Sequence, residues 1–142
     1  MERGIFDCPA AWVRWLPEGV RRPGAAELAL VSWELLALTP CGAQKAAGGV
    51  HCRLLLLPGE SVPLPAAQTI ISYGLSHRDS LTLSSLQEPV LCIQRALPRP
   101  DGTLIEPQEL PLPHLPGHPL ALLPLLGLRL LQMPLTDAVT LR

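Results

Sequence analysis

The stretch VHCRLLLL, residues 50–57, decides the fold, because it is a largely apolar run of strand length between Gly48-Gly49 and Pro58-Gly59. Runs of this kind are typical of strands that are covered on both faces, as in the parallel sheets of α/β proteins. A second run, residues 69–73, is rich in β-branched side chains and ends at Gly74. Since the loop between the two runs is long enough to cross over, we predict that they form adjacent, parallel, buried strands.

The segments that follow predict an antiparallel extension of this sheet. Residues 79–86 alternate between apolar and polar side chains, which predicts a half-exposed strand. Residues 90–97 and 103–112 flank Asp101-Gly102, a dipeptide that favours the turn of an antiparallel hairpin. Proline cannot donate a backbone hydrogen bond, so the last strand is expected at a sheet edge because of its prolines, Pro107, Pro111 and Pro113.

Residues 119–133 predict a helix that is apolar nearly all round, with Arg129 and Gln132 as its clearly polar positions. Pro124 limits this helix, so its regular part either starts near Leu123 or kinks at the proline. A helix without a polar face must be covered on most of its surface. We expect it to be mostly buried, and any exposed remainder to form a homodimer or partner contact.

The N-terminal part of the chain is harder to interpret. Trp12, Trp15 and Leu16 have helical spacing, which predicts a short amphipathic helix that begins near Pro9. Residues 25–38 fit either a helix or a strand over 28–33 that is followed by a turn, and periodicity leaves both open.

Together these segments predict an α/β fold: a small, mostly parallel sheet with an antiparallel β-hairpin extension and a C-terminal apolar helix. The 142 residues correspond to a single domain, and 48% of them are hydrophobic against 16% charged, which argues against disorder. The net charge is −1 and the arginines are scattered. A nucleic-acid partner is therefore not expected.

The cysteines and the termini predict a cytoplasmic protein without a metal site. Four cysteines are widely spaced and form no C-x-x-C pair, unlike the close ligand pairs of zinc sites: Cys8, Cys41, Cys52 and Cys92. The N-terminus lacks the apolar region of a secretory signal, which favours a reducing compartment and free thiols. Residues 115–135 have the length and apolarity of a membrane span, but Arg129 and the prolines make a buried helix the better interpretation.

The sequence has no recognised catalytic motif. It contains no G-x-S-x-G elbow, and its one lysine, Lys45, lies outside a G-x-x-x-x-G-K-[ST] phosphate loop. Glu106 and Glu109 would lie on opposite faces of a strand, so we expect solvated charges that pair with Arg95 or Arg99 rather than a catalytic pair. No cofactor is predicted, and an enzyme is the less favoured class.

The order of the segments carries a resemblance that covers about residues 45–135. The strand 50–57 is followed by the turn 58–60, and the next strand, 70–75, contains Tyr73-Gly74. Residues 76–86 come after it, and Asp101-Gly102 forms the hairpin turn. The segment 112–118 contains a Gly-His pair and leads into the helix 120–131. This order resembles the second half of the central domain of Mur ligases, which add amino acids to muramyl peptides with ATP. The family has an Asn-x-Asp-Asp turn where this chain has residues 58–61, and an asparagine where it has Pro119.

Lys45 stands where the resemblance implies the family's carbamylated, metal-binding lysine. Without the phosphate loop and the acidic Mg²⁺ ligands it has no partners for that role, so we interpret it as a solvated loop lysine. The first hypothesis is therefore a non-catalytic, Mur-ligase-like bacterial module that acts by protein contacts, with a link to cell-wall metabolism. Its partner, or a second copy, would bind through the helix 119–133.

The alternative hypothesis is a small-molecule binding or enzymatic domain. Open α/β sheets bind ligands in the crevice at the carboxyl ends of their strands. Here that crevice would follow strands 50–57 and 69–73, and its ligand-binding residues would be Gly59, Glu60, Tyr73, Gly74 and Ser76.

Overall fold

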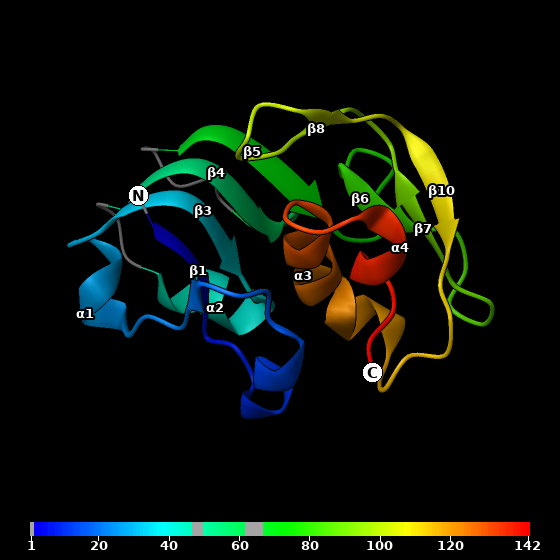
Figure 1. Ribbon diagram of the computed structural model, residues 1–142, viewed down its shortest axis with the longest axis horizontal. Coiled ribbons are helices and arrows are strands. Elements are labelled where there is room, and N and C mark those ends of the chain that lie inside the picture. Colours follow the sequence, from blue (N-terminus) through cyan, green and yellow to red (C-terminus); the bar gives the residue numbers. More distant parts are fainter. Residues whose placement is uncertain (1, 47–49, 62–66) are drawn as a thin grey trace.

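The computed structural model describes residues 2–46, 50–61 and 67–142, and within them eight strands form one sheet (Figure 1). The strand order is β10-β7-β6-β5-β4-β3-β1-β2. The six strands from β6 to β2 run parallel: β1 (Glu2–Phe6), β2 (Val20–Arg21), β3 (Ser32–Leu38), β4 (His51–Pro58), β5 (Ala67–Tyr73) and β6 (Leu81–Leu83). The α/β class is therefore as predicted.

The two runs that decide the fold form neighbouring parallel strands, with Leu54 opposite Thr69 and Leu56 opposite Ile71. Strand β4 is buried on both faces over residues 54–57. Strand β5 is less covered than expected, because Ile70 on its second face is 40% exposed. The expected turn at Gly48-Gly49 lies outside the described residues.

The predicted hairpin is present in two parts. Strand β7 (Val90–Ile93) pairs antiparallel with β6 and with β10 (Gln108–Pro111), which is an edge strand as its prolines predict. Beyond them, β8 (Leu97–Pro98) and β9 (Leu104–Ile105) form a separate two-stranded sheet next to the turn at Asp101-Gly102.

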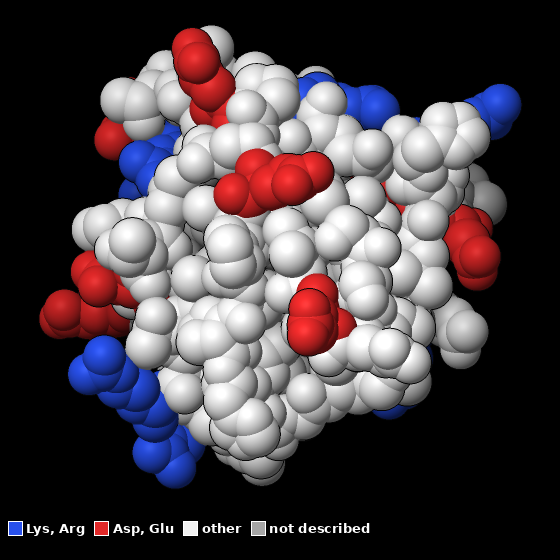
Figure 2. All heavy atoms as spheres, turned by 90° about the vertical axis from the view of Figure 1, so that its right-hand side faces the viewer, with Lys and Arg blue, Asp and Glu red and all other residues white. Residues whose placement is uncertain are grey.

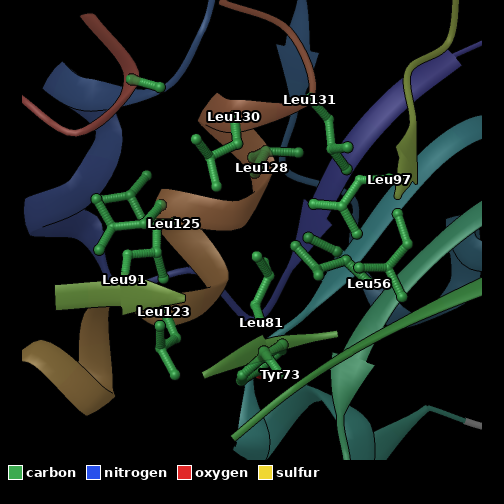
Figure 3. Packing of buried hydrophobic residues seen from close by; sticks show 14 of the residues in the cluster. Leu56, Tyr73, Leu81, Leu91, Leu97, Leu123, Leu125, Leu128, Leu130 and Leu131 are labelled. Atoms are coloured by element: carbon green, nitrogen blue, oxygen red, sulfur yellow. The ribbon is translucent and has the colours of Figure 1, made fainter. Parts of the chain in front are cut away.

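Helix α3 (Pro119–Leu130) packs on one face of the sheet, and Figure 3 shows its leucines gathered with those of the strands. The sheet covers one side of α3. The remaining sides are covered by the 3-10 helix η1 (Ala10–Trp15), by α4 (Leu135–Ala138) and by β8 and β9. Because the sheet covers one side and these small elements cover the others, a helix that is apolar nearly all round can lie in the core.

Gly127 brings α3 close to the sheet. A Cβ at this position would lie 2.9 Å from methyl carbons of both Leu56 and Leu81. The helix begins at Pro119 and continues through Pro124, which excludes a start near Leu123. Among the helices in the described ranges, none has the length and apolarity needed to cross a bilayer.

The second face of the sheet is covered only in part. Helices α1 (Ala25–Leu28) and α2 (Pro40–Lys45) accompany a smaller apolar cluster that includes Trp33, Leu36 and Leu55. The Trp33 indole donates a hydrogen bond of 3.0 Å to the Leu28 carbonyl, which ties α1 to β3.

Two expectations about local structure were wrong, and one strand was not predicted. The strand in residues 25–38 is β3 at 32–38, which follows a helix of one turn, so neither alternative was correct. The N-terminal strand β1 was missed, because five residues are too few to show a period. Strand β6 is buried on both faces rather than half exposed, and Thr82 is 8% exposed.

Candidate functional site

Backbone hydrogen bonds join the carboxyl ends of β4 and β5 to each other and to the start of β6. The amide of Gly59, just after β4, donates to the Tyr73 carbonyl at 2.9 Å, and the amide of Gly74 donates to the Leu81 carbonyl at 3.1 Å. These bonds bring together most of the residues that the sequence predicts as a ligand site.

A residue that the sequence analysis did not select, Asp79, lies at the centre of this region. Its side chain is packed so that a Cβ on Gly59 would lie 1.8 Å from Oδ1, and a Cβ on Gly74 would lie 2.6 Å from Oδ2. Oδ2 accepts a hydrogen bond of 3.1 Å from the Ser76 amide. Asp79 is 5% exposed, so the two glycines form a close cradle around a buried carboxylate.

The side chains of the other predicted residues are used in different ways. The Tyr73 hydroxyl donates to the Leu38 carbonyl at 2.6 Å, and burial raises the pKa of Tyr73 above its usual 10.0. The Ser76 hydroxyl accepts from the Arg78 amide at 3.1 Å. Glu60 is exposed. Gly59, Gly74 and Ser76 thus meet around Asp79, whereas Tyr73 serves the packing of the sheet, and ligand binding at this cradle stays a prediction.

Asp79 carries a weak sequence signal. It stands three residues after Ser76 and follows two glycines that end neighbouring strands. The pattern shows a turn, but nothing in it shows that two glycine backbones far apart in sequence meet one carboxylate. That contact depends on the strand order.

A second position of interest lies between the carboxyl ends of β1 and β3. The chain leaves β1 towards β2 and leaves β3 towards β4, in opposite directions along the sheet, and such a switch point is where open α/β sheets bind ligands. Asp7 follows β1 with a φ of 62°. The Thr39 hydroxyl donates to the Asp7 carbonyl at 3.1 Å and accepts from the Gly42 amide at 3.0 Å, so it caps α2.

Lys45 lies at this switch point and is solvated as expected, but it ends helix α2 instead of lying in a loop, and it has a surface partner. Its Nζ is 3.2 Å from Oδ1 of Asp7. The lysine side chain is 62% exposed, so the pair adds little to stability. Among the described residues, no group of three His, Cys, Asp or Glu side chains could hold a metal ion.

A hollow lies where the β7–β10 pair ends, next to the N-terminus of α3. Its volume is about 540 Å³, and we call it the proline hollow because four prolines line it. It is bounded by two segments, residues 86–90 and residues 111–119, and its polar groups include Glu88 and His114. Leu86 at its rim is 46% exposed.

The charged side chains in the middle of the face that β10 forms are acidic, among mostly uncharged residues (Figure 2). Figure 2 shows this side, with Lys and Arg confined to its margins. Glu106 and Glu109, expected to pair with Arg95 or Arg99, form no ion pair with any described residue. Arg99 instead donates to the Leu130 and Met133 carbonyls, and Arg95 donates to the Arg78 carbonyl. Both glutamates are exposed as expected, and the expected pairing was wrong.

The thiols are free in the described part of the chain and differ in accessibility. Cys41 is exposed, whereas Cys52 is 5% exposed and its thiol donates to the Leu54 carbonyl at 2.8 Å. Burial raises the pKa of the Cys52 thiol from its usual 9.0 to about 12. Cys52 is thus a small core residue, as thiols in apolar runs commonly are.

Three of these places are candidates for the function predicted from the sequence: the Asp79 cradle, the β1–β3 switch point and the proline hollow. The resemblance to Mur ligases stays an expectation from the sequence. No known protein family, curated protein or solved structure matches this chain.

Proposed function

We propose that this chain is a non-catalytic α/β module that acts by protein contact, and that its contact surface is the proline hollow. The observation that carries this proposal is a hollow of about 540 Å³ whose lining combines leucines and prolines with the polar groups of Glu88 and His114, on a face whose central charges are acidic. Exposed apolar surface that is rimmed by polar groups marks interaction sites.

The contact surface differs from the helix 119–133 suggested by the sequence. The leucines at 122, 123, 125, 126, 128 and 130 are at most 4% exposed, which leaves α3 little surface for a partner. The proline hollow, by contrast, has Leu86 exposed at its rim and prolines that fix the backbone on both sides. A lining that is already rigid loses less conformational entropy when a partner binds.

Charge complementarity specifies the chemistry of the partner. Glu88 lines the hollow, and Glu106 and Glu109 are exposed on the hairpin without an ion pair to any described residue. A partner segment that combines apolar side chains with Lys or Arg satisfies both features. The Mur ligase resemblance extends this proposal to a bacterial, cytoplasmic protein with a role in cell-wall metabolism.

The probe for this proposal is a short peptide of leucine, proline and lysine, compared with the same peptide carrying glutamate in place of lysine. Two-dimensional amide NMR is expected to show shifts of the non-proline residues in 86–90 and 111–119 with the lysine peptide alone. Glu88→Lys is expected to weaken binding about tenfold by charge reversal, and Glu18→Lys, an exposed site on another element, is expected to leave it unchanged. Equal binding of both peptides, or shifts confined to other residues, contradicts the proposal.

A second candidate function is small-molecule binding or an enzymatic role at the Asp79 cradle, favoured by the buried carboxylate between Gly59 and Gly74. ATP separates the two functions. We predict no Mg²⁺-dependent ATP binding and no hydrolysis, since the sequence has no glycine loop with a lysine to hold the phosphates. Calorimetry with ATP, with and without Mg²⁺, is the measurement. Saturable, Mg²⁺-dependent heat favours the enzyme class.

A further inference from the structure

Arg129 is a buried cation at the end of α3. It is 7% exposed, and its guanidinium binds backbone carbonyls on two sides. Nε donates to Ala138 at 2.9 Å, Nη2 donates to Asp137 at 2.8 Å and to Thr140 at 3.3 Å, and Nη1 donates to Trp15. It therefore ties η1 to the segment that contains α4.

The charge of Arg129 has no carboxylate in contact with it among the described residues. Backbone carbonyls accept hydrogen bonds from four of the five guanidinium N–H groups, but carbonyls carry no net charge. The second N–H of Nη1 has no partner among the described residues. Burial lowers the pKa of Arg129, and Asp137 opposes this effect. A nearby anion would stabilise a buried cation of this kind.

A hollow of about 330 Å³ adjoins this cation, and we call it the arginine hollow. Besides Arg129, its lining includes Arg14, Trp15 and Arg142, with Asp137 as the acidic member. Arg14 is exposed, its guanidinium carbon is 5.3 Å from the centroid of the Trp15 ring, and it forms no ion pair with a described residue. Among the side chains of the lining, three arginines outnumber one aspartate, and the Trp15 indole donates a hydrogen bond of 2.9 Å to the Arg142 carboxyl oxygen.

A neighbouring hollow with two arginines is a poorer anion site. There Arg3 is paired with Glu34 at 3.4 Å, and Arg99 is committed to carbonyls at the end of α3. Asp101 also lines it and would repel an anion. The arginine hollow differs because Arg14 keeps its hydrogen-bond donors free of carboxylates.

We propose that the arginine hollow binds a phosphate group between Arg14 and Arg129. Guanidinium groups match the oxygens of phosphate in geometry, and two of them balance a dianion. The volume exceeds that of one phosphate ion, so inorganic phosphate and a small phosphate monoester are both suitable sources. This site is separate from the proline hollow, and it does not depend on the function proposed above.

The test titrates the whole chain with inorganic phosphate and with glycerol 3-phosphate, at constant ionic strength and with chloride as the reference anion. Calorimetry and the thermal midpoint are the readouts, because an anion that binds the folded state raises the midpoint. Arg14→Gln is expected to weaken phosphate binding about tenfold, since it removes one charged donor. Arg78→Gln, an exposed arginine on another loop, is the matched control.

If glycerol 3-phosphate binds more tightly than inorganic phosphate, the proposal is supported and the ligand is a phosphate monoester. If the two bind equally, the proposal is supported and the ligand is inorganic phosphate. Arg14 is exposed, so its variant is expected to fold, and the thermal midpoint without added anion checks this. Stabilisation by phosphate no greater than by chloride overturns the proposal. Equal weakening in Arg14→Gln and Arg78→Gln also overturns it, because the effect would then be one of net charge.

Discussion

At the scale of single residues, one carboxylate fixes the ends of two strands. Asp79 occupies the space that a side chain at Gly59 or Gly74 would need, so both positions require glycine for close approach. Arg129 acts in a similar way in the last turn of α3, where one side chain donates hydrogen bonds to backbone carbonyls that would otherwise need water. In both cases a polar group holds segments that are distant in sequence.

Gly59→Ala is expected to destabilise the protein by about 3 kcal/mol, because its Cβ would lie 1.8 Å from Oδ1 of Asp79. Urea unfolding measures the loss. Gly117→Ala is the control, since its Cβ would meet nothing nearer than Leu122 at 3.9 Å. If the two variants unfold at the same urea concentration, the Asp79 carboxylate does not occupy the cradle.

Alkaline pH is expected to destabilise the fold through Cys52 and Tyr73. Burial raises the pKa of Cys52 to about 12 and also raises the pKa of Tyr73, so both groups stay protonated in the folded state while the unfolded chain ionises. Their contribution is fully present below pH 9 and is lost as the pH rises towards 12. The free energy of unfolding then falls by up to about 1.4 kcal/mol per pH unit for each group.

Urea unfolding at pH 7, 9 and 10.5 checks this dependence. Cys52→Ala and Tyr73→Phe should each have a shallower fall of stability above pH 9, although both lose some stability at pH 7. A fall as steep as that of the unmodified chain in both variants would show that neither group carries the effect.

At the scale of elements, α3 is the part of the core that depends most on its surroundings. Its apolar surface is wider than a sheet alone can cover, and η1, α4 and the β8–β9 pair cover the remainder. A helix of this composition would expose leucines if any of these small elements detached. The stability of α3 is therefore shared with segments from both ends of the chain.

Leu126→Asp is expected to unfold the domain, because Leu126 is fully buried and the change puts a charge into the core. Leu126→Ala should fold and lose about 3 kcal/mol. Circular dichroism and gel filtration report folding and assembly. Leu30→Asp, at a leucine that is 82% exposed, should leave both unchanged. A folded but monomeric Leu126→Asp protein, obtained from an oligomeric parent, would make α3 an interface.

At the scale of the whole molecule, the sheet could add further strands only at β2 and β10. Leu112 donates to the Pro89 carbonyl at 3.1 Å, so by alternation the outward backbone positions of the β10 edge are 107, 109, 111 and 113. Three of these four are proline and have no N–H to offer. Strand β2 has only two residues. Both edges are thus poor templates for another chain.

Restoring the missing donors with Pro107→Thr and Pro111→Thr together is expected to cause self-association through β10. Light scattering at increasing protein concentration measures it. The control is Pro116→Thr, an exposed proline outside the strand. A double variant that stays as monodisperse as this control would show that the prolines are not what protects the edge.

The sequence predicted the parts of the fold that have long, uniform patterns, and missed those that depend on strand order. The apolar run of β4, the β-branched run of β5, the Asp-Gly hairpin and the leucine-rich helix all carry local signals. Strand β1 is too short to carry one, and β6 is buried by neighbours that its own alternation does not reveal. Asp79 and Arg129 were missed as organising residues for the same reason, since their partners come from distant segments.

The contacts of Arg129 also affect the order in which parts of the new chain can fold during synthesis on the ribosome. Its guanidinium needs carbonyls of residues 137, 138 and 140, which are synthesised after α3 itself. Until they emerge from the exit tunnel, a positive charge sits on the helix that must enter the apolar core, and its burial is unfavourable. We expect the sheet to form first and the docking of α3 to wait for residues 137–140, so nascent chains stalled before residue 137 should expose the leucines of α3 to chaperones.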